Sequence, residues 1–161
     1  MNPTDPTPWL TSWMVGLPLI VLTVVIHVVG LGLINENVVR ILSSYEGRRR
    51  FTAVFAVVMG ATALLATGLH AVEAVIWAGA YLLVGALPDT KSAMLFSLNA
   101  ITTYGHDNLR LEARWMLMGA VEALNGMILF GLTTAFLYQM IQTVWPLGQR
   151  RGVRHEATPR H

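Results

Sequence analysis

Residues that could hold a partly dehydrated ion are concentrated in one short polar stretch, Ser97–Asn108, which interrupts strongly apolar segments. Its centre reads Thr102-Thr-Tyr-Gly-His-Asp107. Threonine hydroxyls and backbone carbonyls can replace part of the water shell of a cation. Within a membrane, non-helical backbone persists only where protein buries it or where it lines a water-filled path. The stretch therefore predicts a pore loop.

Two pairs of polar residues stand three positions apart within apolar segments, His70 with Glu73 and Glu122 with Asn125. Residues three apart share one face of a helix, so each pair predicts a polar spot on one side of a helix. A carboxylate at membrane depth needs a partner, which makes Glu73 and Glu122 candidates for function. Three interpretations stay open: hydrogen bonds that tie helices together, proton-sensitive gating, and a metal site.

The histidines allow further interpretations. His27 lies in an apolar segment and is more often a packing residue or a donor between helices than a ligand. An enzyme or electron-transfer subunit could use His27 and His70 as haem or metal ligands, provided that both lie at one depth and face each other. His106 lies in the polar stretch, and its imidazole titrates near neutral pH when unperturbed. It either packs behind the loop or tunes the charge of a pore mouth.

The composition indicates a small all-α integral membrane protein. Of the 161 residues, 54% are hydrophobic and 12% are charged, and the formal net charge is +2. The charged share is about half of that in soluble domains. The absence of cysteine excludes disulfides and thiolate metal sites. The arginines flank apolar segments, so we interpret them as topology signals in a lipid bilayer and expect no nucleic-acid partner.

Three apolar segments are long enough to cross a membrane, and a fourth is too short. A crossing helix needs about 20 residues, whereas the segment before the polar stretch has roughly 12, with Asp89 or Thr90 as its cap. We expect, in order, an outer tail 1–11, a first transmembrane helix 12–34, a basic loop 35–50, a long outer helix 51–87, a short pore helix 90–102, a filter 103–107, an inner helix 111–141 and a tail 142–161.

The distribution of arginine predicts the topology. The loop 35–50 and the C-terminal tail each contain four arginines, and the N-terminal tail contains none. The positive-inside rule then places the loop and the C-terminus in the cytoplasm and the N-terminus outside. Three crossings satisfy this arrangement. Because arginine far outnumbers lysine, we expect a bacterial inner membrane.

The chain resembles the pore module of tetrameric potassium channels from about Arg50 to Arg151. The resemblance rests on Ser97-Leu-Asn-Ala-Ile-Thr-Thr103, on the following Tyr-Gly-His-Asp107, and on Phe130-Gly-Leu132 in the last helix. The spacing between the filter aspartate and the Phe-Gly-Leu of the inner helix is that of the family, without a gap.

The resemblance implies a homotetramer and a role for each matching residue. Potassium or another monovalent cation would bind at Thr103, Tyr104 and Gly105, and no other cofactor is expected. The implied ion filter is Thr102, Thr103, Tyr104, Gly105, His106 and Asp107. Gly126 falls on the hinge glycine of the family, and the cavity-lining residues would be Met127, Phe130 and Thr134. A buried polar cluster behind the filter would comprise His70, Glu73, Glu122 and Asn125, joined by Asn99.

The filter differs from the family pattern in a way that bears on selectivity. The family reads Thr-Val-Gly-Tyr-Gly before its aspartate, whereas this chain reads Thr103-Tyr-Gly-His106 before Asp107. One residue and the second glycine are missing, so fewer rings of carbonyl oxygens can form. We therefore expect a passive, weakly selective channel for potassium and sodium and no enzymatic activity. The alternative is a non-conducting membrane scaffold or sensor with the same fold.

Overall fold

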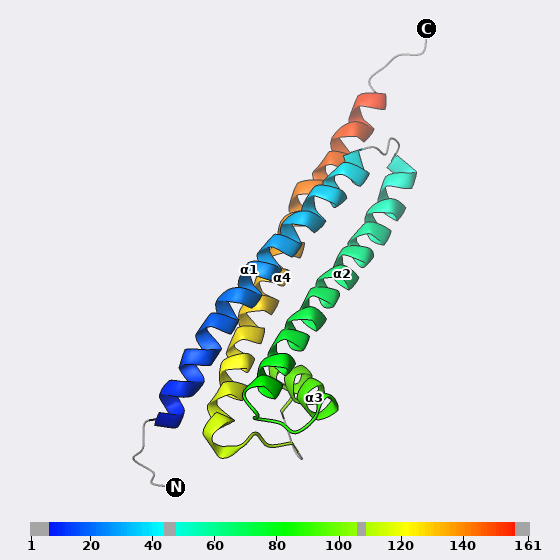
Figure 1. The fold of residues 1–161 in the computed structure, drawn as a ribbon. Helices are drawn as coiled ribbons and strands as arrows, with labels where there is room; N and C mark the ends of the chain where they lie inside the picture. The colour runs from blue at the N-terminus through cyan, green and yellow to red at the C-terminus, as the bar shows by residue number, and fades with distance from the viewer. Residues whose placement is uncertain (1–6, 44–47, 106–108, 157–161) are drawn as a thin grey trace. The chain divides into compact units, whose positions relative to one another are not determined.

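The computed structural model describes residues 7–43, 48–105 and 109–156. This part of the chain is helical, with no strand among the described residues (Figure 1). The elements are α1 (Thr7–Ser43), α2 (Arg48–Leu83), α3 (Thr90–Ile101), the short 3-10 helix η1 (Ala113–Trp115) and α4 (Met116–Glu156). The expected all-helical fold with three helices apolar enough to span a membrane is confirmed.

Three of these helices can cross a membrane by length and composition. The apolar parts span Trp9–Ile41 in α1, Thr52–Leu83 in α2 and Ala113–Thr143, which begins at η1 and continues in α4. Each exceeds the roughly 20 residues that a crossing requires. The chain is thus a multi-pass, all-α membrane protein.

Burial along the first part of α1 is the reverse of that in a water-soluble helix. Ser12, Thr23 and His27 are fully buried, whereas Met14 and Val21 are 75% and 63% exposed. Water would favour the opposite arrangement, since apolar side chains gain by leaving it. In a bilayer, polar and small side chains mediate contacts between helices, and apolar side chains face lipid. The pattern supports a lipid-exposed face on α1.

Three helices extend beyond the segments that hydropathy predicts. The expected loop 35–50 is largely helical, because α1 continues to Ser43 and α2 already begins at Arg48. At the other end, α4 continues past Ile141 to Glu156. Polar residues end a membrane crossing without ending a helix, since glutamate, arginine and glutamine are good helix formers. Hydropathy therefore predicts which residues cross the membrane better than it predicts where each helix begins and ends.

The C-terminus of α2 is set by a glycine rather than by the following proline. Gly85 has a φ of +67°, a left-handed conformation that glycine adopts without strain. The amide of Ala86 donates to the Tyr81 carbonyl at 2.8 Å, and that of Gly85 to the Leu82 carbonyl at 3.1 Å. These two bonds form a Schellman motif. The helix consequently ends at Leu83, before the expected end at Leu87.

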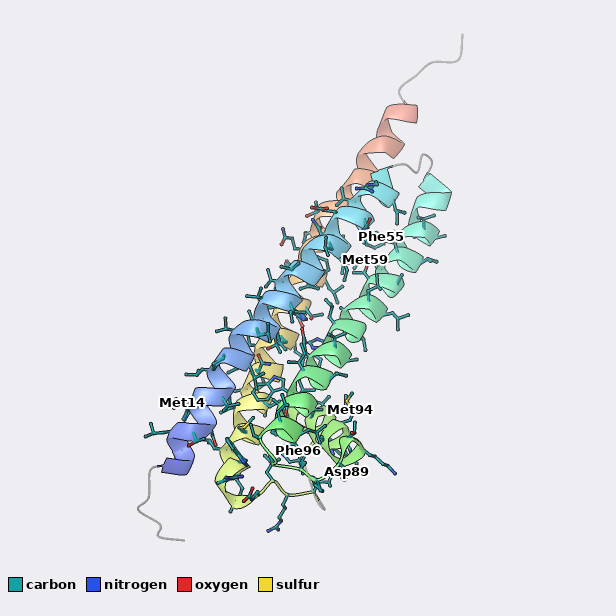
Figure 2. All side chains as sticks on the ribbon, in the orientation of Figure 1. Met14, Phe55, Met59, Asp89, Met94 and Phe96 are labelled. Carbon is teal, nitrogen blue, oxygen red and sulfur yellow. The ribbon has the colours of Figure 1, made fainter. Side chains whose placement is uncertain are left out.

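The chain forms two compact units, each with its own core. The first holds the chain up to His27 together with Leu69–Gly131, and the second holds Val28–Gly68 together with the chain from Leu132. Side chains from α2, α3 and α4 form the main core of the first unit, including Trp77, Tyr81, Phe96, Met118 and Val121. The core of the second unit is smaller and centres on Val38 and Met140, with Phe55 and Met59 packed against them (Figure 2).

The helix α3 begins at a side-chain cap. Asp89 lies directly before α3 (Figure 2) and has extended backbone angles. Its Oδ1 accepts a hydrogen bond of 2.9 Å from the amide of Ser92. This is the N-cap geometry expected from the sequence. Hydrogen bonds from Ser92 lower the pKa of the Asp89 carboxyl below its ordinary value. The ionised cap is therefore the form that stabilises the first turn of α3.

Replacing Asp89 with alanine should weaken the first turn of α3, because the Ser92 amide loses its acceptor. Since the pKa is lowered in the folded state, the cap contributes fully above the pKa of an unfolded aspartate and is lost as the pH falls below about 4. Hydrogen exchange of the Ser92 amide, corrected for intrinsic rates, measures this. Asparagine at position 89 is the matched control, since it keeps an acceptor without a charge. In the Asp89→Asn variant, protection of the Ser92 amide should not change with pH. If this amide were protected equally in the parent and in Asp89→Ala, Asp89 would not be the cap of α3.

Candidate functional site

The segment after α3 contains two left-handed residues, two positions apart. Thr102 ends the helix with right-handed angles, Thr103 has a φ of +56° and Gly105 a φ of +95°, while Tyr104 between them has no positive φ. Glycine tolerates this conformation, but in a residue with a β-carbon it costs roughly 1–2 kcal/mol. Backbone strain of this kind tends to occur where function requires it.

The same segment is tied to α3 by its backbone and exposes its side chains. The amide of Thr103 donates to the Ala100 carbonyl at 2.9 Å, and that of Tyr104 to the Asn99 carbonyl at 3.0 Å. Tyr104 is 84% exposed, and Thr102, Thr103 and Gly105 are also exposed. His106 and Asp107, the rest of the expected filter, lie outside the described residues.

Gly126 lets the C-terminus of α3 approach the backbone of α4 directly. A β-carbon at Gly126 would overlap the carbonyl oxygen of Ile101 and would lie 2.8 Å from its carbonyl carbon. Ile101 is the last residue of α3, directly before the Thr102–Gly105 segment. The expected hinge role of Gly126 stays a prediction. The structure supplies another reason for glycine here, the close approach of two backbones.

Two of the three expected cavity-lining residues are exposed in the first unit. Met127 is exposed, and the Phe130 ring is half-exposed and stacks on the His70 ring with centroids 4.4 Å apart. Thr134 is exposed on the part of α4 that belongs to the second unit. All three lie on α4 at spacings of three and four, which places such residues on one side of a helix.

Glu122 connects three helices of the first unit. It is fully buried on α4, and its Oε2 accepts a hydrogen bond of 2.6 Å from the hydroxyl of Tyr81 on α2. Its Oε1 is hydrogen-bonded to Ser97 Oγ on α3. Ser97 Oγ in turn lies 2.8 Å from the carbonyl oxygen of Ala74 on α2. The carboxyl group thus anchors the helix that precedes the loop to both neighbouring helices.

Asn125 bonds to α1 rather than to the residues around Glu122. Its Nδ2 donates to Thr23 Oγ1 at 2.9 Å, and both side chains are fully buried. The Thr23 hydroxyl itself bonds back to the Leu19 carbonyl at 2.9 Å, so the threonine acts as donor and acceptor. This pair joins α1 to α4. Asn99 is half-buried on α3.

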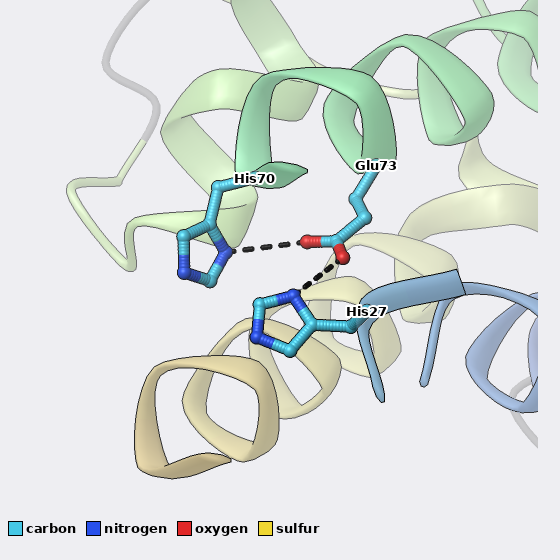
Figure 3. A group of neighbouring side chains, drawn as sticks. All are labelled: His27, His70 and Glu73. Carbon is cyan, nitrogen blue, oxygen red and sulfur yellow. Dashed lines mark hydrogen bonds and ion pairs between the residues drawn. The ribbon is translucent and has the colours of Figure 1, made fainter. Parts of the chain in front are cut away.

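His27, His70 and Glu73 form a compact group between α1 and α2 (Figure 3). His27 Nδ1 lies 2.7 Å from Glu73 Oε1, and His70 Nδ1 lies 3.2 Å from Glu73 Oε2. His27 and Glu73 are fully buried, and the imidazole centroids are 5.0 Å apart. The two oxygens of the Glu73 carboxylate therefore contact two imidazoles, one on α1 and one on α2.

The expected polar cluster is distributed over three separate groups. His70 and Glu73 meet as their spacing predicts, but Glu122 bonds to Tyr81 and Ser97, and Asn125 bonds to Thr23. Thr23, Tyr81 and Ser97 were not predicted as partners, and His27 was considered beside His70 but not as a partner of Glu73. A signal for two of them was present, since Thr23 and His27 are four residues apart and so share one face of an otherwise apolar helix.

The site thus combines a strained loop that follows a short helix, a buried carboxyl that anchors this helix, and a second carboxylate that holds two imidazoles. Comparisons of the chain with protein-family models, with curated proteins and with solved structures find no match for it. The function is therefore argued from the geometry and chemistry of these residues.

Proposed function

We propose that the chain is one subunit of a passive cation channel, in which the loop after α3 lines an ion path shared by four copies. The channel conducts potassium with weak selectivity over sodium. The proposal places it in a bacterial inner membrane, with the N-terminus outside and the C-terminus in the cytoplasm, as the arginine distribution predicts.

The observation that carries the proposal is the backbone of Thr103 and Gly105. Thr103 is the left-handed residue of a Schellman motif that ends α3, a position where glycine is usual and threonine is strained, and Gly105 adds a second left-handed residue two positions later. In a non-helical segment, backbone carbonyl oxygens are not bound within a helix or sheet of their own. Such oxygens are the ligands that cation filters use.

The length and anchoring of α3 support the same interpretation. Its 12 residues extend about 18 Å, too short for a bilayer core of about 30 Å. Its buried residues Ala93, Phe96 and Ala100 belong to the main core of the first unit, and Ser97 bonds to Glu122. A short helix fixed in this way holds the following loop in one position, as a filter requires.

The proposed ion path needs further copies of the chain. A single loop supplies only part of a coordination ring, so an ion path along a symmetry axis needs several subunits. Met127 and the half-exposed Phe130 would then face the central cavity, as the resemblance to potassium-channel pore modules implies.

Flux measurements on the purified protein in liposomes test the proposal. Potassium and sodium should both leave vesicles that contain the protein, and the detergent-purified particle should have the mass of four chains. Gly105→Ala should reduce the flux at least tenfold, because a φ of +95° is strained for any residue with a β-carbon.

The matched control is Gly79→Ala on α2, where a β-carbon meets nothing within 4 Å among the described residues. This variant should conduct like the parent. A monomeric or dimeric particle would overturn the proposal. A tetramer without flux would instead support the non-conducting scaffold.

A further inference from the structure

We infer that His27, His70 and Glu73 form a binding site for one divalent transition-metal ion, with Zn²⁺ as the representative case. The site goes beyond the proposed channel, because its three ligands lie on α1 and α2 and none belongs to the loop after α3. Its occupancy can be measured in detergent without any ion flux, so failure of either proposal leaves the other intact.

The spacing of the ligand atoms suits a metal of this size. One ligand atom from each residue can be chosen so that all three lie within 4.8 Å of one another. Zinc binds imidazole nitrogen and carboxylate oxygen at about 2.0–2.2 Å, so the ligands of a tetrahedral ion stand roughly 3.4 Å apart. The present nitrogen–oxygen separations are 2.7 and 3.2 Å. An ion could lie between these ligand atoms after shifts of less than about 1 Å.

The chemistry of the ligands selects a transition metal. Two imidazoles and one carboxylate form a typical donor set for zinc or ferrous iron, whereas potassium, calcium and magnesium prefer oxygen ligands. Three protein ligands leave a fourth position for water. The ion would also give the carboxylate of Glu73 the cationic partner that a buried charge needs in a membrane.

Burial and access are both compatible with an ion at this position. His27 and Glu73 are fully buried, which holds their side chains in place before a metal arrives. His70 is 11% exposed, and its ring rests on that of Phe130. Figure 3 shows that the second ring nitrogen of each histidine points away from the carboxylate, so the two Nδ1 atoms are the ones that converge. Because His70 is the partly exposed ligand, an ion would enter the site past its side chain.

The first test uses the unmodified protein. Metal-free protein in detergent is titrated with Co²⁺, which replaces zinc and has intense visible absorption bands when it is four-coordinate. We expect a saturating spectrum at one Co²⁺ per chain and its loss when Zn²⁺ is added. Absence of a spectrum, together with no zinc retained after dialysis, would overturn the inference whatever the variants do.

The second test assigns the ligands. His70→Ala and Glu73→Gln should each reduce the affinity for Zn²⁺ at least tenfold and abolish the Co²⁺ spectrum, while His155→Ala, near the C-terminal end of α4, should bind like the parent. Zinc should also raise the melting temperature of the parent and of His155→Ala, but not of the His70 and Glu73 variants. Unchanged zinc binding in His70→Ala, which lies at the partly exposed edge and is the best tolerated change, would show that the metal binds elsewhere and would refute the site.

Discussion

Replacing Gly126 with alanine should destabilise the protein by about 3 kcal/mol or more and abolish flux. The added β-carbon would overlap the carbonyl oxygen of Ile101 and lie 3.0 Å from its α-carbon. These are backbone atoms, so no side-chain rotation can relieve the clash. Overpacking typically costs 1–3 kcal/mol even where side chains can adjust. The end of α3 would have to move, and the Thr102–Gly105 segment would move with it. Thermal unfolding in detergent and liposome flux measure the two effects.

The matched control for Gly126 lies on the same helix. At Gly131 an added β-carbon meets nothing within 4 Å among the described residues. Alanine also has a higher helix propensity than glycine, by about 1 kcal/mol in a helix interior. Gly131→Ala should therefore be as stable as the parent or slightly more stable, and it should conduct.

The comparison also separates two roles of Gly126. If the glycine serves only as a hinge, alanine would alter opening and closing but leave the resting fold as stable as in Gly131→Ala. A clash with Ile101 predicts a lower melting temperature in every state of the proposed channel. Equal stability of the two variants would contradict the close packing.

The number and type of the helices could be predicted from the lengths of the apolar segments and from capping residues. The single long helix α2 and the Asp89 cap of α3 follow from local signals, because crossing length and cap chemistry are properties of short segments. The helix ends were harder to predict. Gly85 ends α2 through its left-handed conformation, and a glycine within an apolar run carries no mark that it will do so.

The partners of the polar residues could be predicted only within one helix. The pair His70 and Glu73 follows from a spacing of three residues, but His27 reaches Glu73 across 46 positions of the chain. Which faces of two helices meet depends on their rotation about their own axes, and small residues such as Gly16, which faces Val121, help to set it. A single sequence contains no direct signal for that rotation.

The hydrogen bonds around Glu122 are best satisfied when its carboxyl group is neutral. Ser97 Oγ lies within hydrogen-bond distance of the Ala74 carbonyl and of Glu122, yet a hydroxyl has only one proton to donate. If the carboxyl is neutral, its own proton goes to Ser97, Ser97 donates to Ala74, and Tyr81 donates to the other carboxyl oxygen. Every group then has a partner. The described part of the chain shows no ion pair to Glu122, which also favours the neutral form in a membrane.

Glutamine at position 122 should therefore be tolerated, with a loss of stability below about 1 kcal/mol, whereas leucine should cost about 2–4 kcal/mol. The glutamine amide can donate to Ser97 while its carbonyl accepts from Tyr81, and one amide hydrogen is left over. Leucine leaves the buried Tyr81 hydroxyl and Ser97 without their shared partner. Thermal unfolding of both variants in the same detergent measures the difference. An ionised carboxylate would accept from Ser97 and Tyr81 together, which a glutamine amide cannot do. Equal destabilisation by glutamine and leucine would therefore show that Glu122 is charged, and the anchoring of α3 would then depend on a buried anion.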